Sequence, residues 1–244
     1  GDVDGAESEL RAMVDRVDDA DAALRLTRSL IAKRGEDAAR RELAARIAAT
    51  SSPSERATYE IALAELELRA GEDQSAERRL RDLVTALDEE ADEADRLRFG
   101  PEARVALARL LMRRDDGAEE AERLAEAVLE TDGTNASAAL IKGRMLIDAE
   151  EPDEAVILLR RALEANPSNV DLMLTLAGAY ERSGSRELAA DQLATAMSES
   201  NFDPDITRRY AAYLRSAGRV EAAETVLAEA ARRAPENVAI LSDL

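Results

Sequence analysis

The chain has 244 residues, of which 52 are acidic and 33 basic, so its formal net charge is −19. Such a field repels polyanions and argues against nucleic acid and anionic membrane surfaces as partners. Histidine and cysteine are absent, which excludes disulfides, thiol nucleophiles and the usual zinc sites. Hydrophobic residues make up 45% and aromatic residues only 2%, a balance that favours closely packed helices and an all-α fold.

The chain begins with GDVDGAESELRAM, in which a glycine–aspartate turn precedes an amphipathic run. We interpret this run as the second helix of a repeat whose first helix is missing, and we assign a half repeat to residues 1–20. Gly1, Gly35 and Gly71 then recur at intervals of 34 and 36 residues. These intervals predict repeats at about 21–56 and 57–100.

The next interval is longer, because Ala76 and Ala121 are 45 residues apart. The surplus lies in residues 87–101, and the extra segment 88–100 is predicted to be an extended second helix or an ordered loop. The next repeat is expected to resume at Pro101. The carboxylates of this segment could form a divalent-cation site or a solvated acidic helix end, and the missing calcium-loop spacing favours the latter.

Beyond residue 101 the period is a regular 34 residues. It predicts repeats at 101–135, 136–169, 170–203 and 204–237, followed by a partial helix at 238–244. Five positions keep this interval: Ala155, Ala189 and Ala223; Leu159, Leu193 and Leu227; Ala162, Ala196 and Ala230; Gly143, Ala177 and Ala211; and Leu146, Tyr180 and Leu214.

Each period divides into two helical patterns. In VDLMLTLAGAYERSG the apolar residues have helical spacing, and Gly184 ends the run. SRELAADQLATAMSES follows, with Leu188, Ala189 and Leu193 expected on one apolar stripe. Small residues such as Ala177 and Ala189 allow two antiparallel helices to approach closely. Asparagine and proline then close the unit, because proline cannot continue a helix.

The stretch ANPSN followed by VDLMLTLAGAYERSGSRELAADQLATAM resembles a tetratricopeptide repeat. The match includes the small residue and the aromatic of the first helix, the alanine, large apolar, alanine series of the second, and the closing proline. It is strong over residues 102–237, although the consensus tryptophan is absent and Lys142 stands where leucine is usual. The resemblance implies a right-handed superhelical solenoid of about six antiparallel helix pairs with half units at both ends, as a segment of a longer array in a bacterial protein.

In that family the first helix of each repeat lines a concave groove, so the resemblance also implies a binding surface here. The groove positions of this chain hold nine basic and six acidic residues. Arginine forks there would suit an acidic or C-terminal peptide. Alternatively, the arginines pair with neighbouring glutamates and only keep the groove soluble. The residues expected to contact a partner are Arg109, Arg113, Arg144, Arg182, Arg208 and Arg215.

No phosphate-binding loop or nucleophile–base pair is present, so catalysis, cofactors and metals are not expected. The two-carboxylate clamp of chaperone-binding family members is not expected either, because the asparagines fall in turns and Lys33 is the sole groove lysine. The leading hypothesis is a non-enzymatic scaffold that binds a peptide or protein in its groove. The alternative is a spacer in a longer envelope or exopolysaccharide-export repeat protein. The compartment, cytoplasm or periplasm, and the oligomeric state stay open.

Overall fold

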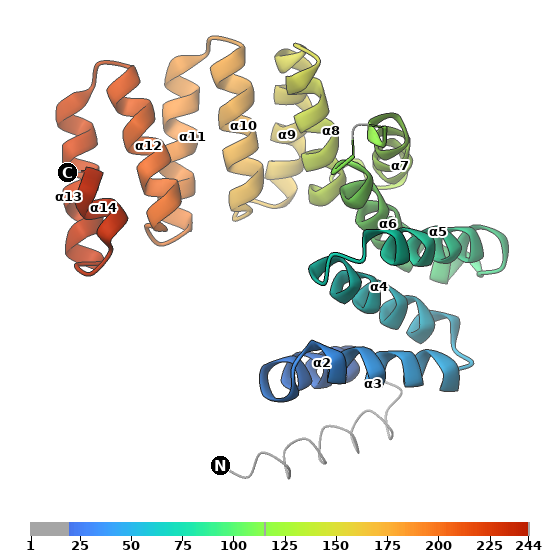
Figure 1. The fold of residues 1–244 in the computed structure, drawn as a ribbon. Helices are drawn as coiled ribbons and strands as arrows, with labels where there is room; N and C mark the ends of the chain where they lie inside the picture. The colour runs from blue at the N-terminus through green and yellow to red at the C-terminus, as the bar shows by residue number, and fades with distance from the viewer. Residues whose placement is uncertain (1–19, 115, 244) are drawn as a thin grey trace. The chain divides into compact units, whose positions relative to one another are not determined.

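The structure is a computed structural model that describes residues 20–114 and 116–243, with side chains from Arg25 onward. The described residues form thirteen α-helices and no strand (Figure 1). The predicted all-α architecture is therefore confirmed. Consecutive helices pack as pairs in α2–α3, α4–α5, α8–α9, α10–α11 and α12–α13, and α14 follows. The helices are α2 Ala20–Arg34, α3 Glu36–Ala49, α4 Pro53–Arg69, α5 Asp73–Glu89, α6 Glu93–Leu111, α7 Ala118–Thr131, α8 Ala136–Asp148, α9 Pro152–Ala165, α10 Val170–Arg182, α11 Arg186–Glu199, α12 Pro204–Ser216, α13 Val220–Arg233 and α14 Val238–Asp243.

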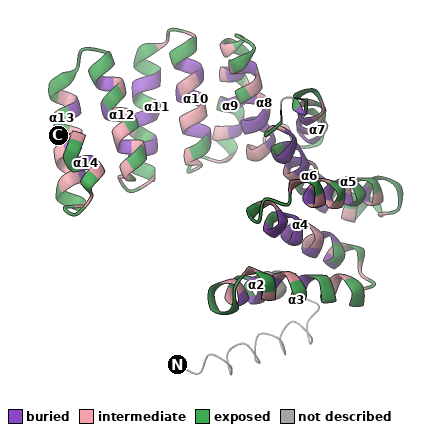
Figure 2. Cartoon of the chain, viewed as in Figure 1, coloured by how far each residue is buried: buried purple, intermediate pink, exposed green. Residues whose placement is uncertain are grey.

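The chain divides into two compact units, one up to Leu124 and the other from Ala125, and the boundary falls inside α7. In the first unit, the apolar faces of α2, α3 and α4 meet in one cluster that includes Leu26, Leu43 and Leu66. A second cluster joins α4, α5 and α6 and contains Ile61 and Phe99. Each helix buries one stripe and leaves the other in solvent (Figure 2), as amphipathic helices do.

The second unit is built from the residues of the 34-residue period. Its larger cluster joins α8, α9, α10 and the start of α11, and the other joins α12, α13 and α14. All five periodic positions are buried. Close approach of the helices depends on small residues, because a Cβ atom at Gly143 would lie 2.8 Å from Cδ2 of Leu159. Leu188 was expected on the buried stripe but is 49% exposed, since it lies to one side of the stripe that Ala189 and Leu193 form.

Both ends of the paired helices follow rules of local structure. The side chains of Asn135, Asn169, Asp203 and Asn237 each accept a hydrogen bond from a backbone N–H of the helix that follows, which satisfies one of its free donors. Four turns between consecutive helices use left-handed glycines, Gly35, Gly71, Gly184 and Gly218, for example Gly184 at φ 77°.

The expectation for the extra segment at 88–100 was wrong in its placement. Helix α5 ends at Glu89, and residues 93–100 lengthen α6, the first helix of the next pair, so Pro101 lies inside a helix and does not begin one. The physical reason is that Asp92 caps α6 and Phe99 packs into the α4–α5 core. Helix α4 begins at Pro53, directly after its cap Ser52. The half repeat expected at residues 1–20 lies almost wholly outside the described residues.

Candidate functional site

The predicted binding surface of the second unit belongs to its first helices, α8, α10 and α12. We call their exposed charged residues the first-helix face of this unit. They carry equal numbers of basic and acidic groups, so the face is locally neutral although the chain as a whole is strongly acidic. The members of this face are Arg144, Asp148, Asp171, Glu181, Arg182, Asp205, Arg209 and Arg215.

Two of the predicted arginines are available to a partner. Arg144 on α8 and Arg182 at the end of α10 are both exposed. Among the residues that the structure describes, neither of them contacts a carboxylate. An exposed guanidinium group without a carboxylate partner has five N–H donors that bond to water. These donors can bond instead to an acceptor of a binding partner.

The other two predicted arginines of this unit are engaged within the chain. Nε of Arg208 donates to Oδ2 of Asp243 at 2.5 Å, and this bond raises the pKa of Arg208. Arg215 donates to the backbone carbonyl of the same Asp243. Both contacts attach α14 to α12. These two arginines are therefore bonded within the chain.

Arg209 is a member of this face that sequence reasoning missed. Its Nη2 atom donates to the backbone carbonyl of Leu174 on α10 at 3.3 Å and lies 3.7 Å from Oε1 of Glu181. The guanidinium lies near Gly178, where an added Cβ atom would be in ordinary van der Waals contact with it at 3.8 Å. No signal in the sequence identifies this contact.

The remaining two predicted arginines lie in the first unit. Arg109 is an exposed residue of α6. Arg113, just beyond the end of α6, makes an ion pair with Asp73 at 3.2 Å, in which both side chains are largely in solvent. Exposed pairs of this kind contribute little and exchange easily.

The first unit has a cavity on the side where its first helices α2, α4 and α6 meet. Its volume is about 200 Å³. Apolar side chains form part of its lining, and Glu65 and Glu102 contribute carboxylates. Desolvation and the neighbouring charge of Glu65 raise the pKa of Glu102, although that residue as a whole is exposed. Like charges and loss of water both disfavour ionisation of a carboxyl group.

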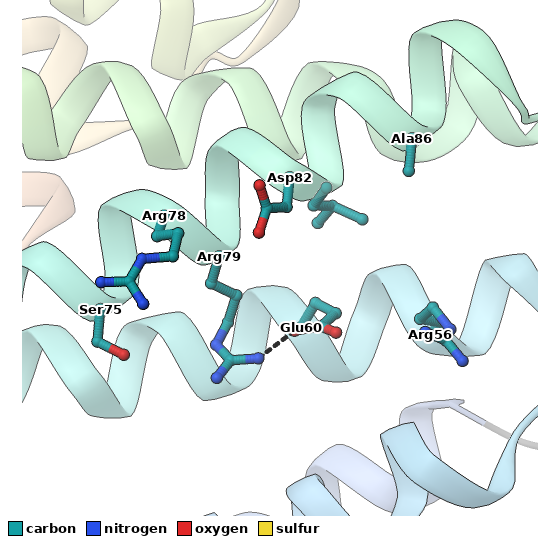
Figure 3. A pocket seen from close by; sticks show the side chains of 8 residues that line it. Arg56, Glu60, Ser75, Arg78, Arg79, Asp82 and Ala86 are labelled. Atoms are coloured by element: carbon teal, nitrogen blue, oxygen red, sulfur yellow. Dashed lines mark hydrogen bonds and ion pairs between the residues drawn. The ribbon is translucent and has the colours of Figure 1, made fainter.

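A larger cavity of about 320 Å³ lies between α4 and α5 (Figure 3). Its centre is closed by an ion-pair cluster in which Arg79 binds Glu60 and also forks onto Glu67, at 2.9 and 3.1 Å. Glu67 is only 4% exposed and accepts a further hydrogen bond from Ser75. A buried carboxylate with these partners is satisfied, so we assign this cluster a structural role.

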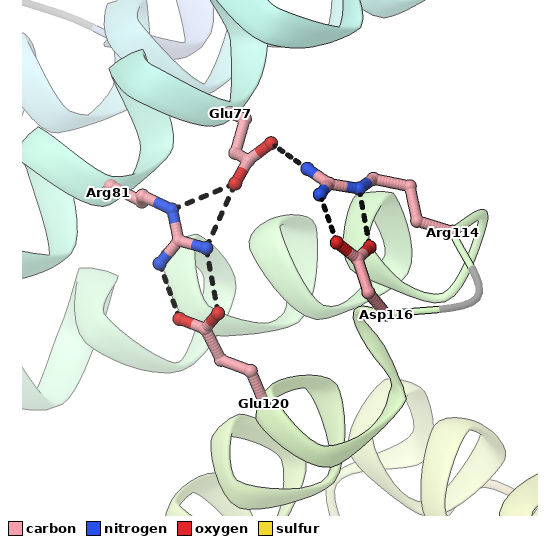
Figure 4. A network of polar contacts seen from close by, with 5 residues as sticks. All are labelled: Glu77, Arg81, Arg114, Asp116 and Glu120. Carbon is pink, nitrogen blue, oxygen red and sulfur yellow. Dashed lines mark hydrogen bonds and ion pairs between the residues drawn. The ribbon is translucent and has the colours of Figure 1, made fainter.

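A second polar network ties α5 to the α6–α7 turn and to α7 (Figure 4). Arg81 bridges Glu77 and Glu120, while Arg114 bridges Glu77 and Asp116. The hydrogen bond from Arg81 lowers the pKa of Glu120. These two arginines have carboxylate partners from adjacent repeats, so the network is part of the packing between repeats.

The acidic segment that raised the question of a cation site is used for local structure. Asp92 caps α6, Asp95 accepts a hydrogen bond from Ser54, and Asp88 pairs with Arg104. Over residues 20–114 and 116–243, no three carboxylates come together as a metal site. In the same part of the chain, no helix has the length and apolar content needed to span a membrane.

Comparisons with known proteins agree with this architecture. Two sequence patterns of the tetratricopeptide repeat family match residues 105–170 and 146–213. No curated protein matches the chain.

Among solved structures, MamA from Desulfovibrio magneticus RS-1 matches at 16% identity with a TM-score of 0.58, covering 78% of this chain and 99% of that one. A thermophilic tetratricopeptide repeat protein in Thermus thermophilus matches at 24% identity with a TM-score of 0.56, covering 80% of this chain and 99% of that one. A tetratricopeptide repeat protein from Parabacteroides merdae ATCC 43184 matches at 15% identity with a TM-score of 0.60, covering 86% of this chain and 78% of that one. At these identities the likeness concerns the fold. The sequence matches identify tetratricopeptide repeats in residues 105–213, and the likeness to these structures shows that the chain shares their fold.

Proposed function

We propose that the chain is a non-enzymatic scaffold that holds a protein or peptide partner on the first-helix face of its second unit. The observation that carries the proposal is the pair Arg144 and Arg182. They lie on the neighbouring first helices α8 and α10, and within the described part of the chain they have no carboxylate partner. Arg208, Arg209 and Arg215 of the same layer are all engaged in contacts within the chain.

An acidic stretch of the partner is the chemistry that fits this pair, because a guanidinium binds a carboxylate through two parallel hydrogen bonds. The acidic residues Asp148 and Glu181 flank the two arginines and keep the surface neutral overall. They would discourage indiscriminate binding of polyanions and favour a partner whose own charges alternate. The net charge of −19 further disfavours nucleic acid as the partner.

The test is affinity capture from a lysate of the source organism, followed by mass spectrometry. The native chain is compared with an Arg144→Glu, Arg182→Glu variant. The matched control is Arg160→Glu with Arg186→Glu, which makes the same charge change on exposed residues of the second helices α9 and α11. We expect a partner that is retained by the native chain and the control and lost from the first variant.

Retention by all three proteins would move the binding site away from Arg144 and Arg182. If none of them retains a partner, the scaffold proposal fails and the spacer alternative takes its place. Circular dichroism of the three proteins shows whether a loss of binding comes from a loss of fold.

A further inference from the structure

We propose that the cavity between α2, α4 and α6 is a subsite for a lysine side chain of the bound partner. This inference rests on the proposed function and extends it to the first unit, where none of the arginines that carry that function lies. The partner would then need a positively charged residue in addition to the acidic stretch that the second unit would bind. The partner chemistry is thus a segment that carries charges of both signs.

The lining of the cavity suits the hydrocarbon part of lysine. Ile31 of α2 and Ile61 and Leu66 of α4 line it, and the latter two are only 5% and 2% exposed. Lysine carries its charge on a flexible four-carbon stem that packs along apolar surface while its ammonium group stays near water. The volume of about 200 Å³ is small, so the cavity fits one side chain and is too small for most complete ligands.

The charges at the cavity suit the ammonium group. Glu65 of α4 and Glu102 of α6 are carboxylates from adjacent first helices that both line the cavity. Arg69 reaches Glu65 only at 4.0 Å, and both side chains are more than half exposed. Within the described residues, no cation contacts Glu102. A bound ammonium would supply a counter-charge to Glu102 and would compete with Arg69 for Glu65.

The raised pKa of Glu102 supports this placement, because burial and the charge of Glu65 are its causes and no arginine offsets them. Arg28 and Arg69 line the same cavity, and Arg69 pairs with Glu65. Among the described residues, Glu102 is therefore the carboxylate of this cavity without a cationic partner. Arg28 and Arg69 in the same lining disfavour a divalent cation at these two carboxylates.

The experiment uses isoleucine methyl NMR on the full chain, because Ile31 and Ile61 report directly from the cavity. The probe is the peptide acetyl-Ala-Lys-Ala-amide, and its matched control has norleucine in place of lysine, which keeps the stem and removes the charge. We expect the methyl signals of Ile31 and Ile61 to shift and saturate with the lysine peptide, at an affinity at least about tenfold above that of the control, which corresponds to about 1.4 kcal/mol. The methyl of Ile47, which does not line the cavity, serves as the internal reference.

In a Glu65→Gln, Glu102→Gln variant the lysine peptide should bind no better than the norleucine peptide. The matched variant Glu89→Gln, Glu93→Gln makes the same charge change at exposed sites of α5 and α6 outside the cavity and should bind like the native chain. If a variant does not fold, the carboxyl ¹³C titration of Glu102 in the native chain replaces it. The pKa of Glu102 should then fall when the lysine peptide is added.

Equal shifts with both peptides, an absence of shifts at Ile31 and Ile61, or an unchanged pKa of Glu102 would each overturn the subsite. This test involves no natural partner, and the capture experiment above alters only the second unit. The subsite can therefore fail while the scaffold proposal stands. A failed capture experiment with a positive peptide titration would instead remove the scaffold function and leave a lysine-binding cavity.

Discussion

The three turns α8–α9, α10–α11 and α12–α13 adopt the same left-handed conformation, but only two of them have glycine at the left-handed position. Gly184 and Gly218 have φ angles of 77° and 75°, and Glu150, one period earlier, has a φ of 64°. All three turns make the same pair of backbone hydrogen bonds, illustrated by Glu151 N–H to Leu146 O at 2.8 Å. The fold therefore imposes the conformation at position 150, where the β-carbon of glutamate makes it unfavourable.

The first prediction is that Glu150→Gly stabilises the chain. Relief of the left-handed conformation is worth about 1–2 kcal/mol, and the greater freedom of glycine in the unfolded chain removes about 0.4–1 kcal/mol of this. We expect the free energy of unfolding in urea to rise by about 0.5–1 kcal/mol. Glu150→Ala is the control, because alanine keeps the strained conformation and should bring no such gain. Equal stabilities of the two variants would contradict the explanation.

The second prediction concerns the pH dependence of stability through Glu102. Its folded pKa is raised above the unfolded value, so its contribution to stability is fully present below the unfolded pKa and is lost as pH rises through the folded pKa. Glu102→Gln, which cannot ionise, should therefore be more stable than the native chain at pH 7, by up to about 0.5 kcal/mol because solvent screens an exposed group. Urea titrations at pH 7 and near pH 4 should show this advantage shrink with acid, and an advantage that grows with acid would refute the assignment.

Helices that begin each period share a side-chain cap, and this cap explains the asparagines that sequence analysis placed only in turns. Oδ1 of Asn169 accepts a hydrogen bond from the N–H of Leu172 at 3.0 Å. The same kind of hydrogen bond is accepted by Asn135 one period earlier, by Asp203 one period later and by Asn237 two periods later. The helices therefore begin at the same point of each period because a donor of the first turn must find an acceptor.

The third prediction is that Asn169→Ala destabilises the second unit by about 1 kcal/mol, the usual cost of removing such a cap. Asn169→Asp is the matched control. Aspartate keeps the acceptor, and its charge is favourable at a helix N-terminus, so this variant should equal or exceed the native stability. Urea unfolding followed by circular dichroism measures both, and an aspartate variant as unstable as the alanine variant would rule out capping as the cause.

The two units differ in how polar contacts join their repeats. In the first, arginines on α3, α5, α6 and the α6–α7 turn pair with carboxylates of neighbouring helices, as in the pairs of Arg40 with Glu72 and Arg81 with Glu120. In the second, ion pairs between repeats involve the first helices, as in the pairs of Arg208 with Asp243 and Arg209 with Glu181. Neither α9 nor α11 makes an ion pair with any described residue, and their packing is apolar. The second helix α5 therefore depends more on electrostatics than α9 and α11 do.

The fourth prediction follows from this difference and uses hydrogen exchange at about 0.1 M and about 1 M NaCl. Salt screens exposed ion pairs, and the pairs of Arg81 and Arg114 with their carboxylates together contribute about 1 kcal/mol to the α5 region. Amide exchange in α5 should therefore accelerate by about fivefold in high salt relative to α9 and α11. Arg81→Ala should reduce this salt effect, and an equal response of the three helices would contradict it.

Much of the fold could be predicted, because the periodic apolar and small residues are all compatible with one arrangement, a stack of helix pairs. The identity of a repeat is local information, carried by positions such as Leu159 and Ala162 whose residue types recur in the two following periods. The placement of the extra segment could not be predicted in this way. Its residues are equally compatible with an extension of α5 and with an extension of α6. The packing of Phe99 against Ile61 and Leu87 decided that the segment extends α6.

The candidate site was less predictable for a physical reason. The family pattern indicates which positions face outward, and Arg144 and Arg182 are indeed exposed. It does not indicate where a long side chain ends, so the bonds of Arg208 to Asp243 and of Arg209 to Leu174 were not foreseen. Whether the arginines bind a partner stays a prediction.

The amino-acid order alone established an all-α chain of helix pairs with a 34-residue period, because backbone propensity, apolar spacing and turn residues act over short distances. Only the folded structure showed which charges are satisfied within the chain, because ion pairs join residues that lie far apart in sequence, as Arg40 and Glu72 do at a separation of 32. The cavity that Glu65 and Glu102 share arises in the same way, since α2, α4 and α6 meet only when the repeats stack.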